Sequence, residues 1–274
     1  MLSGSLPGSA TTFASASIGC GSAAALYLLI LRPPGFARED RSQLLRSAVG
    51  GALLLTGPLV ALLLPRDLSG ASVTMALALT PVVIAVAEAA TDHTRETLAG
   101  RLWPGLAAIA GLLLLLTQPS LRNPAEDLLL ALTPLLTGCG AVLFCSAQQS
   151  RWRLPAALVG GCIALGLGAL INLATHAGGW PEMPGLAAGF DALEAVLALV
   201  ALGRLSAARW SAQFAIVPLL VVLEGIVLMP GSFSGRMILG LLLLALAAFA
   251  LLIPPSEESR LDLRASTVHP SSTD

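Results

Sequence analysis

Nine long apolar runs cover most of the chain, and they constrain its fold more than any other feature. A helix needs about 20 mainly apolar residues to cross a bilayer. Runs of about that length lie near 12–32, 43–64, 69–91, 97–118, 124–149, 154–177, 183–204, 207–229 and 234–253. Charged residues make up only 11% of the 274, against roughly 25% in a soluble globular chain. The sequence therefore predicts an all-α integral membrane protein with nine transmembrane helices in a lipid bilayer.

The connections between the apolar runs are short and rich in proline and glycine. Proline cannot continue a helical hydrogen-bond ladder without cost, so each run is expected to end near such a residue. These breakers stand at 33–35, Pro65, Pro119, Pro124, 178–181 and 230–231. Beyond the last run, the polar stretch 255–274 has too little apolar content to build a core, and we expect a disordered tail there.

Arginine is distributed unevenly between the two ends of the predicted spans. If the loop around 33–42 is cytoplasmic, twelve of the fifteen basic residues fall inside, and only Arg66, Arg122 and Arg236 fall outside. Cytoplasmic loops of membrane proteins carry such an excess. We therefore predict a multi-pass protein of the plasma (inner) membrane, with its N-terminus outside and its C-terminus in the cytoplasm. The asymmetry also supports nine spans, because one span more or fewer would scramble it.

One stretch of the sequence occurs twice, from Leu68 to Pro119 and from Leu205 to Pro254. The matching pairs are Leu68/Leu205, Ser69/Ser206, Pro81/Pro218, Arg101/Arg236, Gly105/Gly240 and Pro119/Pro254. The offset is 137 residues up to Pro81 and 135 from Arg101 onward, so the copies differ by one two-residue gap. Leucine and alanine matches carry little weight in so apolar a chain. The serine, proline, arginine and glycine matches in register indicate an internal duplication.

The two copies are predicted to have opposite orientations in the membrane. Arg101 follows a predicted cytoplasmic loop, whereas Arg236 follows a predicted external loop. Inverted repeats are typical of secondary transporters, whose binding site lies near the bilayer midplane where the repeats meet. We predict a first repeat of four helices at 1–118, a second of five helices at 119–254, and the tail beyond it.

The repeated unit resembles the EamA-type drug/metabolite transporter superfamily, whose carriers have ten helices in two inverted halves of five. The family pattern joins Leu-Ser, an apolar run, a proline, a Gly-Glu-Arg junction and a glycine. The matching residues are Pro81, Glu96, Arg101 and Gly105 in the first half, and Pro218, Arg236 and Gly240 in the second, where Gly231 replaces the glutamate. The resemblance covers nearly all of 10–254, and it implies a transporter without identifying the substrate.

The first half departs from the family pattern because it has four predicted helices and not five. Aligned through the repeat, the span 12–32 resembles the second helix of the family, so the family's first helix has no counterpart. That helix would form a wall of the central cavity. Three explanations stay open: the start of the chain is placed too late, the chain is degenerate, or a partner chain supplies the wall.

Two acidic residues near the centre of the span 183–204 are the strongest candidates for a binding site. Glu194 falls at its midpoint, and Asp191 lies one turn away on the same face. A charged side chain at mid-bilayer costs about 2.5–3.5 kcal/mol on insertion scales unless it faces water, a polar partner or a substrate. We predict that Glu194 faces a polar cavity between the halves, where it could carry a proton or meet a substrate ammonium. A glutamate hydrogen-bonded within the bundle is the alternative.

The first repeat contributes a second set of candidates. With the 137-residue offset, Glu194 corresponds to Gly57, which lies beside Pro58 in the middle of a span. A Gly-Pro break frees backbone carbonyls, and transporters use such discontinuities for binding. A kink that serves only packing is the alternative. Thr80 and Gln213 are expected to line the same cavity from neighbouring helices.

The other notable side chains have simpler interpretations. Glu88 lies near the inner end of its span and can extend to the interface, whereas Glu224 lies off-centre and is open to either a structural or a binding role. The four tryptophans are predicted to anchor helices at the membrane interface. The four cysteines and three histidines show no metal-ligand spacing, so we expect no cofactor and no metal. A net charge of −1 and the lack of a basic run argue against nucleic-acid binding.

These features predict a secondary transporter or exporter of small polar metabolites, such as amino acids, that works by alternating access around a midplane cavity, and not an enzyme. Two alternatives stay open. A transport-inactive scaffold of the same fold is favoured by the missing helix. A membrane enzyme acting on a lipid-linked substrate would need a metal or phosphate-binding cluster at a loop, which the sequence does not contain. A homodimer also stays open.

Overall fold

The computed structural model describes residues 9–31, 41–60, 70–92, 96–115, 124–147, 151–175, 186–228 and 234–253. All of its regular structure is helical, and these residues contain no strand. The helices are α1 (Ser9–Leu31), α2 (Arg41–Val60), α3 (Gly70–Ala78), α4 (Thr80–Asp92), α5 (Glu96–Leu115), α6 (Pro124–Ser146), α7 (Arg153–Thr175), α8 (Leu186–Arg204), α9 (Ala207–Trp210), α10 (Gln213–Leu228) and α11 (Gly235–Leu252).

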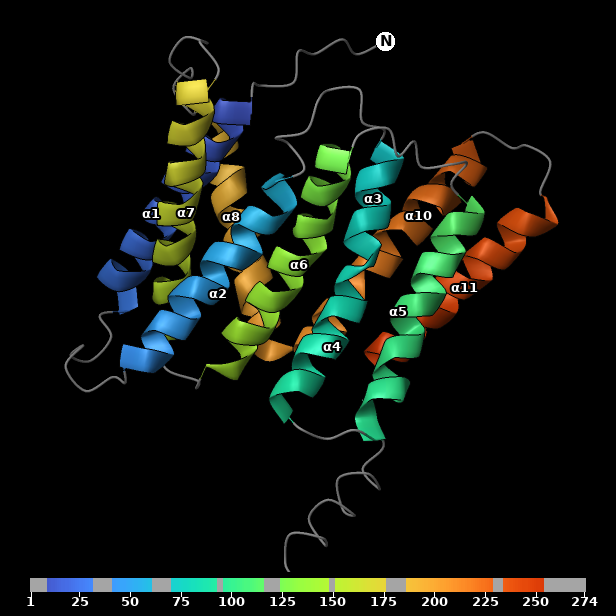
Figure 1. The fold of residues 1–274 in the computed structure, drawn as a ribbon. Helices are drawn as coiled ribbons and strands as arrows, with labels where there is room; N and C mark the ends of the chain where they lie inside the picture. Colours follow the sequence, from blue (N-terminus) through green and yellow to red (C-terminus); the bar gives the residue numbers. More distant parts are fainter. Residues whose placement is uncertain are drawn as a thin grey trace, which may run out of the picture.

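Within this part of the chain the eleven segments form nine rods, because α3 continues into α4 and α9 continues into α10 (Figure 1). Six of the rods are long and apolar enough to cross a membrane, including the two interrupted ones. Rods α5 and α6 contain shorter apolar helices, Leu102–Leu115 and Leu130–Ser146. The all-α fold with nine helices is confirmed. The predicted tail at 255–274 lies outside the described residues.

The two interrupted rods carry the equivalent prolines Pro81 and Pro218, but they break at different places. In the first, the Leu79 N–H bonds to the Ala76 carbonyl, and Pro81 lies in the first turn of α4, where its missing N–H costs nothing. In the second, the break falls at Ser211, so Pro218 lies inside α10. The same proline therefore accompanies a break in one rod and stays within a helix in the other.

Glycines allow the rods to approach one another closely. A Cβ added to Gly50 would lie 2.7 Å from the Phe144 nitrogen of α6, and one added to Gly140 would lie 2.8 Å from the Gly50 oxygen of α2. Gly111 of α5 and Gly240 of α11 meet in the same way, with 2.8 Å from the Gly111 position to the Gly240 oxygen. Small residues at such crossings are how membrane helices gain close packing. In the same helix pair, Arg236 donates to the Leu113 carbonyl at 3.0 Å.

Equivalent helices of the two predicted repeats run in opposite directions. Figure 1 shows α2 and α5 running from the lower to the upper end of the bundle, whereas α8 and α11 run from the upper to the lower end. Packing between the halves is reciprocal: α1 packs on α7, α5 packs on α11, and the α2–α7 contact has its equivalent in α8–α1. This is the arrangement that an inverted repeat predicts. The boundary between the repeats at 118/119 stays a prediction.

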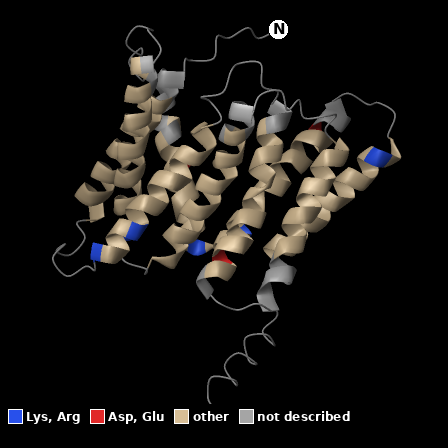
Figure 2. Cartoon of the chain, in the orientation of Figure 1, with Lys and Arg blue, Asp and Glu red and all other residues tan. Residues whose placement is uncertain are grey.

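Charged side chains lie at the two ends of the bundle more than along its length. Figure 2 shows the arginines gathered at the lower end, with one at the upper end, at the start of α11. The lower end is where α2 begins and where α8 ends at Arg204. The asymmetry agrees with the predicted arginine bias, and the direction of insertion stays a prediction.

Candidate functional site

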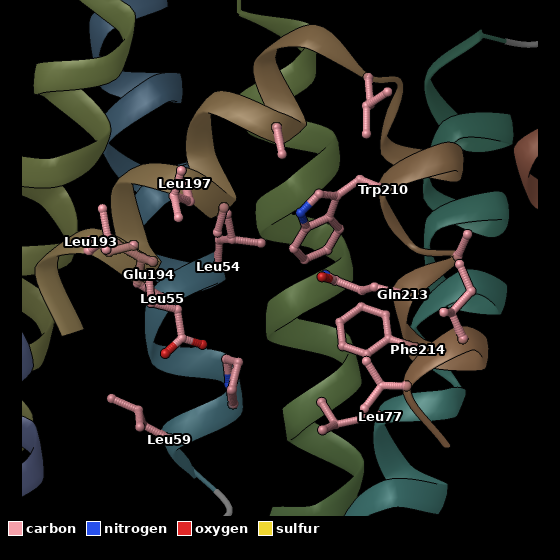
Figure 3. A pocket seen from close by; sticks show the side chains of 18 of the residues that line it. Leu54, Leu55, Leu59, Leu77, Leu193, Glu194, Leu197, Trp210, Gln213 and Phe214 are labelled. Carbon is pink, nitrogen blue, oxygen red and sulfur yellow. The ribbon is translucent and has the colours of Figure 1, made fainter. Parts of the chain in front are cut away.

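A cavity of about 1070 Å³ lies between α8 on one side and α9 and α10 on the other. Helices α1, α2 and α3 also line it, and Leu165 of α7 and Leu252 of α11 contribute to its wall. Both predicted repeats therefore contribute helices to one cavity. Figure 3 shows it from close by, with α2 and α8 on the left and α9 and α10 on the right.

Glu194 and Gln213 are the polar side chains at the centre of this cavity. Glu194 is the ninth residue of the 19 in α8, one position before the midpoint, and its side chain is exposed. Gln213 is the first residue of α10, directly after the break at Ser211, and is also exposed. Figure 3 shows both side chains pointing into the space between α8 and α10. The arrangement can offer a ligand one carboxylate and one amide from opposite walls.

The remaining lining is mostly apolar, which corrects the expectation of a polar cavity. Leu54, Leu55 and Leu59 line it from α2, and Leu193 and Leu197 line it from α8. Besides Glu194 and Gln213, the polar or charged lining residues are Thr74 and Arg209. The physical reason is that the helices are apolar on most of their surface. A cavity between them is therefore polar only where one of their few polar residues lies on the face that lines it.

An aromatic pair flanks Gln213. The rings of Trp210 and Phe214 lie 5.4 Å apart between centroids, at an interplanar angle of 81°, an edge-to-face contact. Trp210 is only 7% exposed and lines the cavity, so the prediction that it anchors a helix at the interface is wrong. The signal for its role was present in the sequence, because Trp210, Gln213 and Phe214 are spaced to share one helical face.

Of the predicted Gly-Pro break, only Pro58 reaches the cavity. Gly57 is buried and faces α6, where an added Cβ would meet the Thr137 hydroxyl and would lie 2.8 Å from the Thr137 nitrogen. The preceding Thr56 donates its hydroxyl to the Ala52 carbonyl at 2.7 Å. Gly57 therefore serves helix packing, which was the alternative interpretation of this break.

Thr80 does not lie on the cavity. It is completely buried, and its hydroxyl has no hydrogen-bond partner in the structure. Thr74, from the preceding helix α3, lines the cavity in its place. Asp191 belongs to α8, but its side chain lies outside the described part of the structure. The structure thus brings Glu194, Gln213 and Pro58 together and leaves Gly57 and Thr80 elsewhere.

Metal chemistry has no support in the described residues, since no three His, Cys, Asp or Glu side chains among them come together. The four cysteines are free, and Cys20 is buried on the cavity wall.

No protein-family model and no curated protein matches the sequence. A solved structure described as "Crystal structure of protein" is similar to this chain with a TM-score of 0.62 and 19% sequence identity. The match covers 91% of this chain and 90% of that chain. The fold of this helical membrane protein is thus shared over nearly the whole length of a known structure, and the likeness carries no information on activity.

Proposed function

We propose that this protein is a secondary transporter of the EamA-type drug/metabolite kind, which moves small polar metabolites such as amino acids by alternating access. The observation that supports it best is Glu194, an ionisable residue halfway along its helix that points into a cavity shared by both predicted repeats. An ionisable residue inside a membrane protein marks a substrate or ion pathway more often than a structural contact.

The lining narrows the class of substrate. A carboxylate and an amide can bind an ammonium and a second polar group, and the leucines around them favour a ligand that also has an apolar part. Trp210 adds an aromatic wall next to Gln213, and aromatic rings attract cations. Among amino acids and related compounds, those with apolar side chains fit this lining best.

The arrangement of the helices supports alternating access as the mechanism. Two oppositely oriented repeats can exchange conformations: each half takes up, in one state, the conformation that the other half has in the second state. This exchange opens the cavity to the opposite side of the membrane. A substrate shifts such an equilibrium only by the difference in its affinity for the two states. Glu194 and Gln213 lie on α8 and α10 of one repeat and Pro58 on α2 of the other, so movement between the halves would change the distances among them.

A transport-inactive scaffold is the second candidate, because no helix among the described residues packs along both α8 and α10. A flux measurement separates the two functions. Purified protein in liposomes should accumulate one or more compounds from a panel of labelled amino acids and amines. Glu194→Gln should lower that flux by at least about tenfold with little change in melting temperature, since glutamine keeps the shape and loses the charge.

The matched control is Glu88→Gln, which removes an acid near the end of α4 away from the cavity. Its flux should equal that of the wild type. If Glu194→Gln transports normally while the wild type is active, Glu194 is not part of the pathway. If no member of the panel is transported by a stably folded wild type, the scaffold is the better description.

A further inference from the structure

Helix α6 fills a groove between α2 and the rod formed by α3 and α4. It packs along α2 and also contacts α4 and α3. We call this the covered groove. Its fit depends on Gly50, Gly57 and Gly140, where α2 and α6 approach each other closely enough to exclude a Cβ.

The equivalent groove of the second repeat lies between α8 and the rod formed by α9 and α10. We call it the open groove, because the cavity occupies it and no helix in the described part of the chain lies where α6 lies in the covered one. The duplication makes the two comparable residue by residue. The α2 residues Gly50, Leu54 and Gly57 stand 137 positions before Ala187, Asp191 and Glu194. The α8 position that corresponds to Gly57 on the α6-binding face of α2 therefore carries a carboxylate, that of Glu194.

The walls of the open groove are exposed. Leu193 and Leu197 of α8 are 55% and 58% exposed, and Val217 of α10 is 57% exposed. Because these three side chains are apolar, contact with lipid chains would be enough to cover them. Glu194 and Gln213 lie between them and are also exposed, and lipid chains offer no hydrogen-bond partner to a carboxylate or an amide. The open groove therefore matches an occupant that is apolar outside and polar at mid-depth.

We propose that the open groove is the docking site for a single membrane-spanning helix of a separate polypeptide, which places a hydrogen-bond donor or a cation against Glu194. Charge complementarity favours this occupant over a second copy of the chain. In a symmetric dimer whose two-fold axis passes through the middle of the open groove, Glu194 would face the same residue of the partner, and like charges at close range repel in a low dielectric. A helix with a central lysine supplies the opposite charge, and one with a central glutamine or serine supplies a neutral hydrogen-bond donor.

The bound helix differs from α6 in how it is held. In the covered groove, glycines allow backbone contact between α2 and α6. At the equivalent position in the open groove, the side chain of Glu194 keeps the partner farther from α8, so a polar contact replaces close packing. The partner helix then forms the outer wall of the cavity. This inference concerns assembly, and its test needs no transported substrate.

The test uses two designed peptides of 23 residues with the same leucine-alanine sequence, one with lysine at its centre and one with leucine. Binding to the purified protein is measured by fluorescence transfer in vesicles of phosphatidylethanolamine and phosphatidylglycerol. We expect the lysine peptide to bind at least tenfold more tightly than the leucine peptide. Glu194→Leu should abolish that difference. Equal binding of the two peptides to the wild type, or a difference that persists in Glu194→Leu, overturns the proposal.

A relocated carboxylate is the matched control. Leu242 lies on α11, near mid-helix, and is 61% exposed away from the cavity. The double variant Glu194→Leu/Leu242→Glu keeps the charge at a similar depth on another face. It should bind both peptides equally. Restored preference for the lysine peptide would mean that any exposed carboxylate suffices, and the proposal would fall.

A photoreactive residue at position 197, compared with one at 242, then tests the native membrane. The proposal is supported if the residue at 197, but not the one at 242, cross-links to one single-span polypeptide, and if this cross-link is lost in Glu194→Leu. Cross-linking to a second copy, to a segment of the same chain, or to lipid only overturns it.

Discussion

The covered groove and the open groove are built from equivalent helices, yet within the described part of the chain a helix fills only the covered one. In the covered groove, Gly57 leaves room for the Thr137 side chain of α6. In the open groove, the equivalent position holds Glu194, which points into a cavity. Equivalent positions thus contribute to helix packing in one groove and to a candidate binding site in the other. The comparison teaches that two equivalent pairs of helices can be put to different uses when a glycine in one corresponds to a charged side chain in the other.

The largest effect should come from filling the contact between α2 and α6. Gly140→Ala places a methyl group against the backbone of α2, 2.8 Å from the Gly50 oxygen. Backbone cannot move aside as a side chain can, so we expect a loss of about 3 kcal/mol in unfolding free energy. Denaturant unfolding in detergent micelles measures it. Gly203→Ala on α8 is the control, because its nearest neighbour is 4.0 Å away, and it should stay within about 0.5 kcal/mol of the wild type.

Two leucines on α8 separate its packed face from its open face. Leu199 is completely buried, whereas Leu197 is 58% exposed on the groove. Leu199→Ala should cost roughly 2 kcal/mol, since it leaves a cavity among packed helices and a membrane supplies less apolar transfer energy than water does. Leu197→Ala should cost less than about 0.5 kcal/mol. Equal melting temperatures for the two variants would contradict an unfilled groove.

The accessibility of equivalent residues gives a third comparison. Gln213 lines the open groove, and its equivalent Ala76 on α3 is only 7% exposed. In a chain whose native cysteines are replaced, Gln213→Cys should react with a water-soluble thiol reagent at least about tenfold faster than Ala76→Cys, because a packed site reacts only through rare opening. Similar rates in membrane vesicles would show that the cavity is dry.

The smallest effect concerns the end of the covered groove where α6 meets α7. The Arg153 guanidinium lies 4.1 Å from the centroid of the Phe144 ring. Phe144→Leu keeps an apolar side chain and removes this cation–π contact, so the loss should be about 1 kcal/mol in unfolding free energy. Phe249→Leu, on an exposed ring of α11, is expected to leave stability unchanged. If Phe249→Leu lost more unfolding free energy than Phe144→Leu, the loss would be assigned to the smaller size of leucine and not to the cation–π contact.

The sequence predicted the helices well, because the length of an apolar run and the prolines at its ends act locally. It did not predict that Pro81 would accompany a break while Pro218 would stay inside a helix. That outcome depends on the surroundings of each rod. The Ser211 break has no equivalent at Thr74, its counterpart in the first copy, where α3 is continuous. The repeat predicted equivalent positions but not equivalent local geometry.

The candidate site was predictable to the extent that depth in the membrane determines it. Glu194 stood out because a mid-span carboxylate needs a polar environment, and Gln213 followed from its neighbourhood in the repeat. The role of Gly57 was not predictable, since it depends on the position of Thr137, 80 residues further along the chain. The aromatic pair was missed because tryptophan in a membrane protein also has a common role at the interface.

The hydrogen bond from Arg236 to the Leu113 carbonyl has a consequence for how the chain is made. These residues are 123 positions apart, so α5 has left the ribosome long before α11 is synthesised. The hydrogen bond between the Arg236 guanidinium and the Leu113 carbonyl can form only after α11 has been synthesised and has packed beside α5. Packing of α11 against α5 should therefore be a late step of biogenesis, and truncation before α11 should leave a membrane-inserted intermediate that lacks this hydrogen bond.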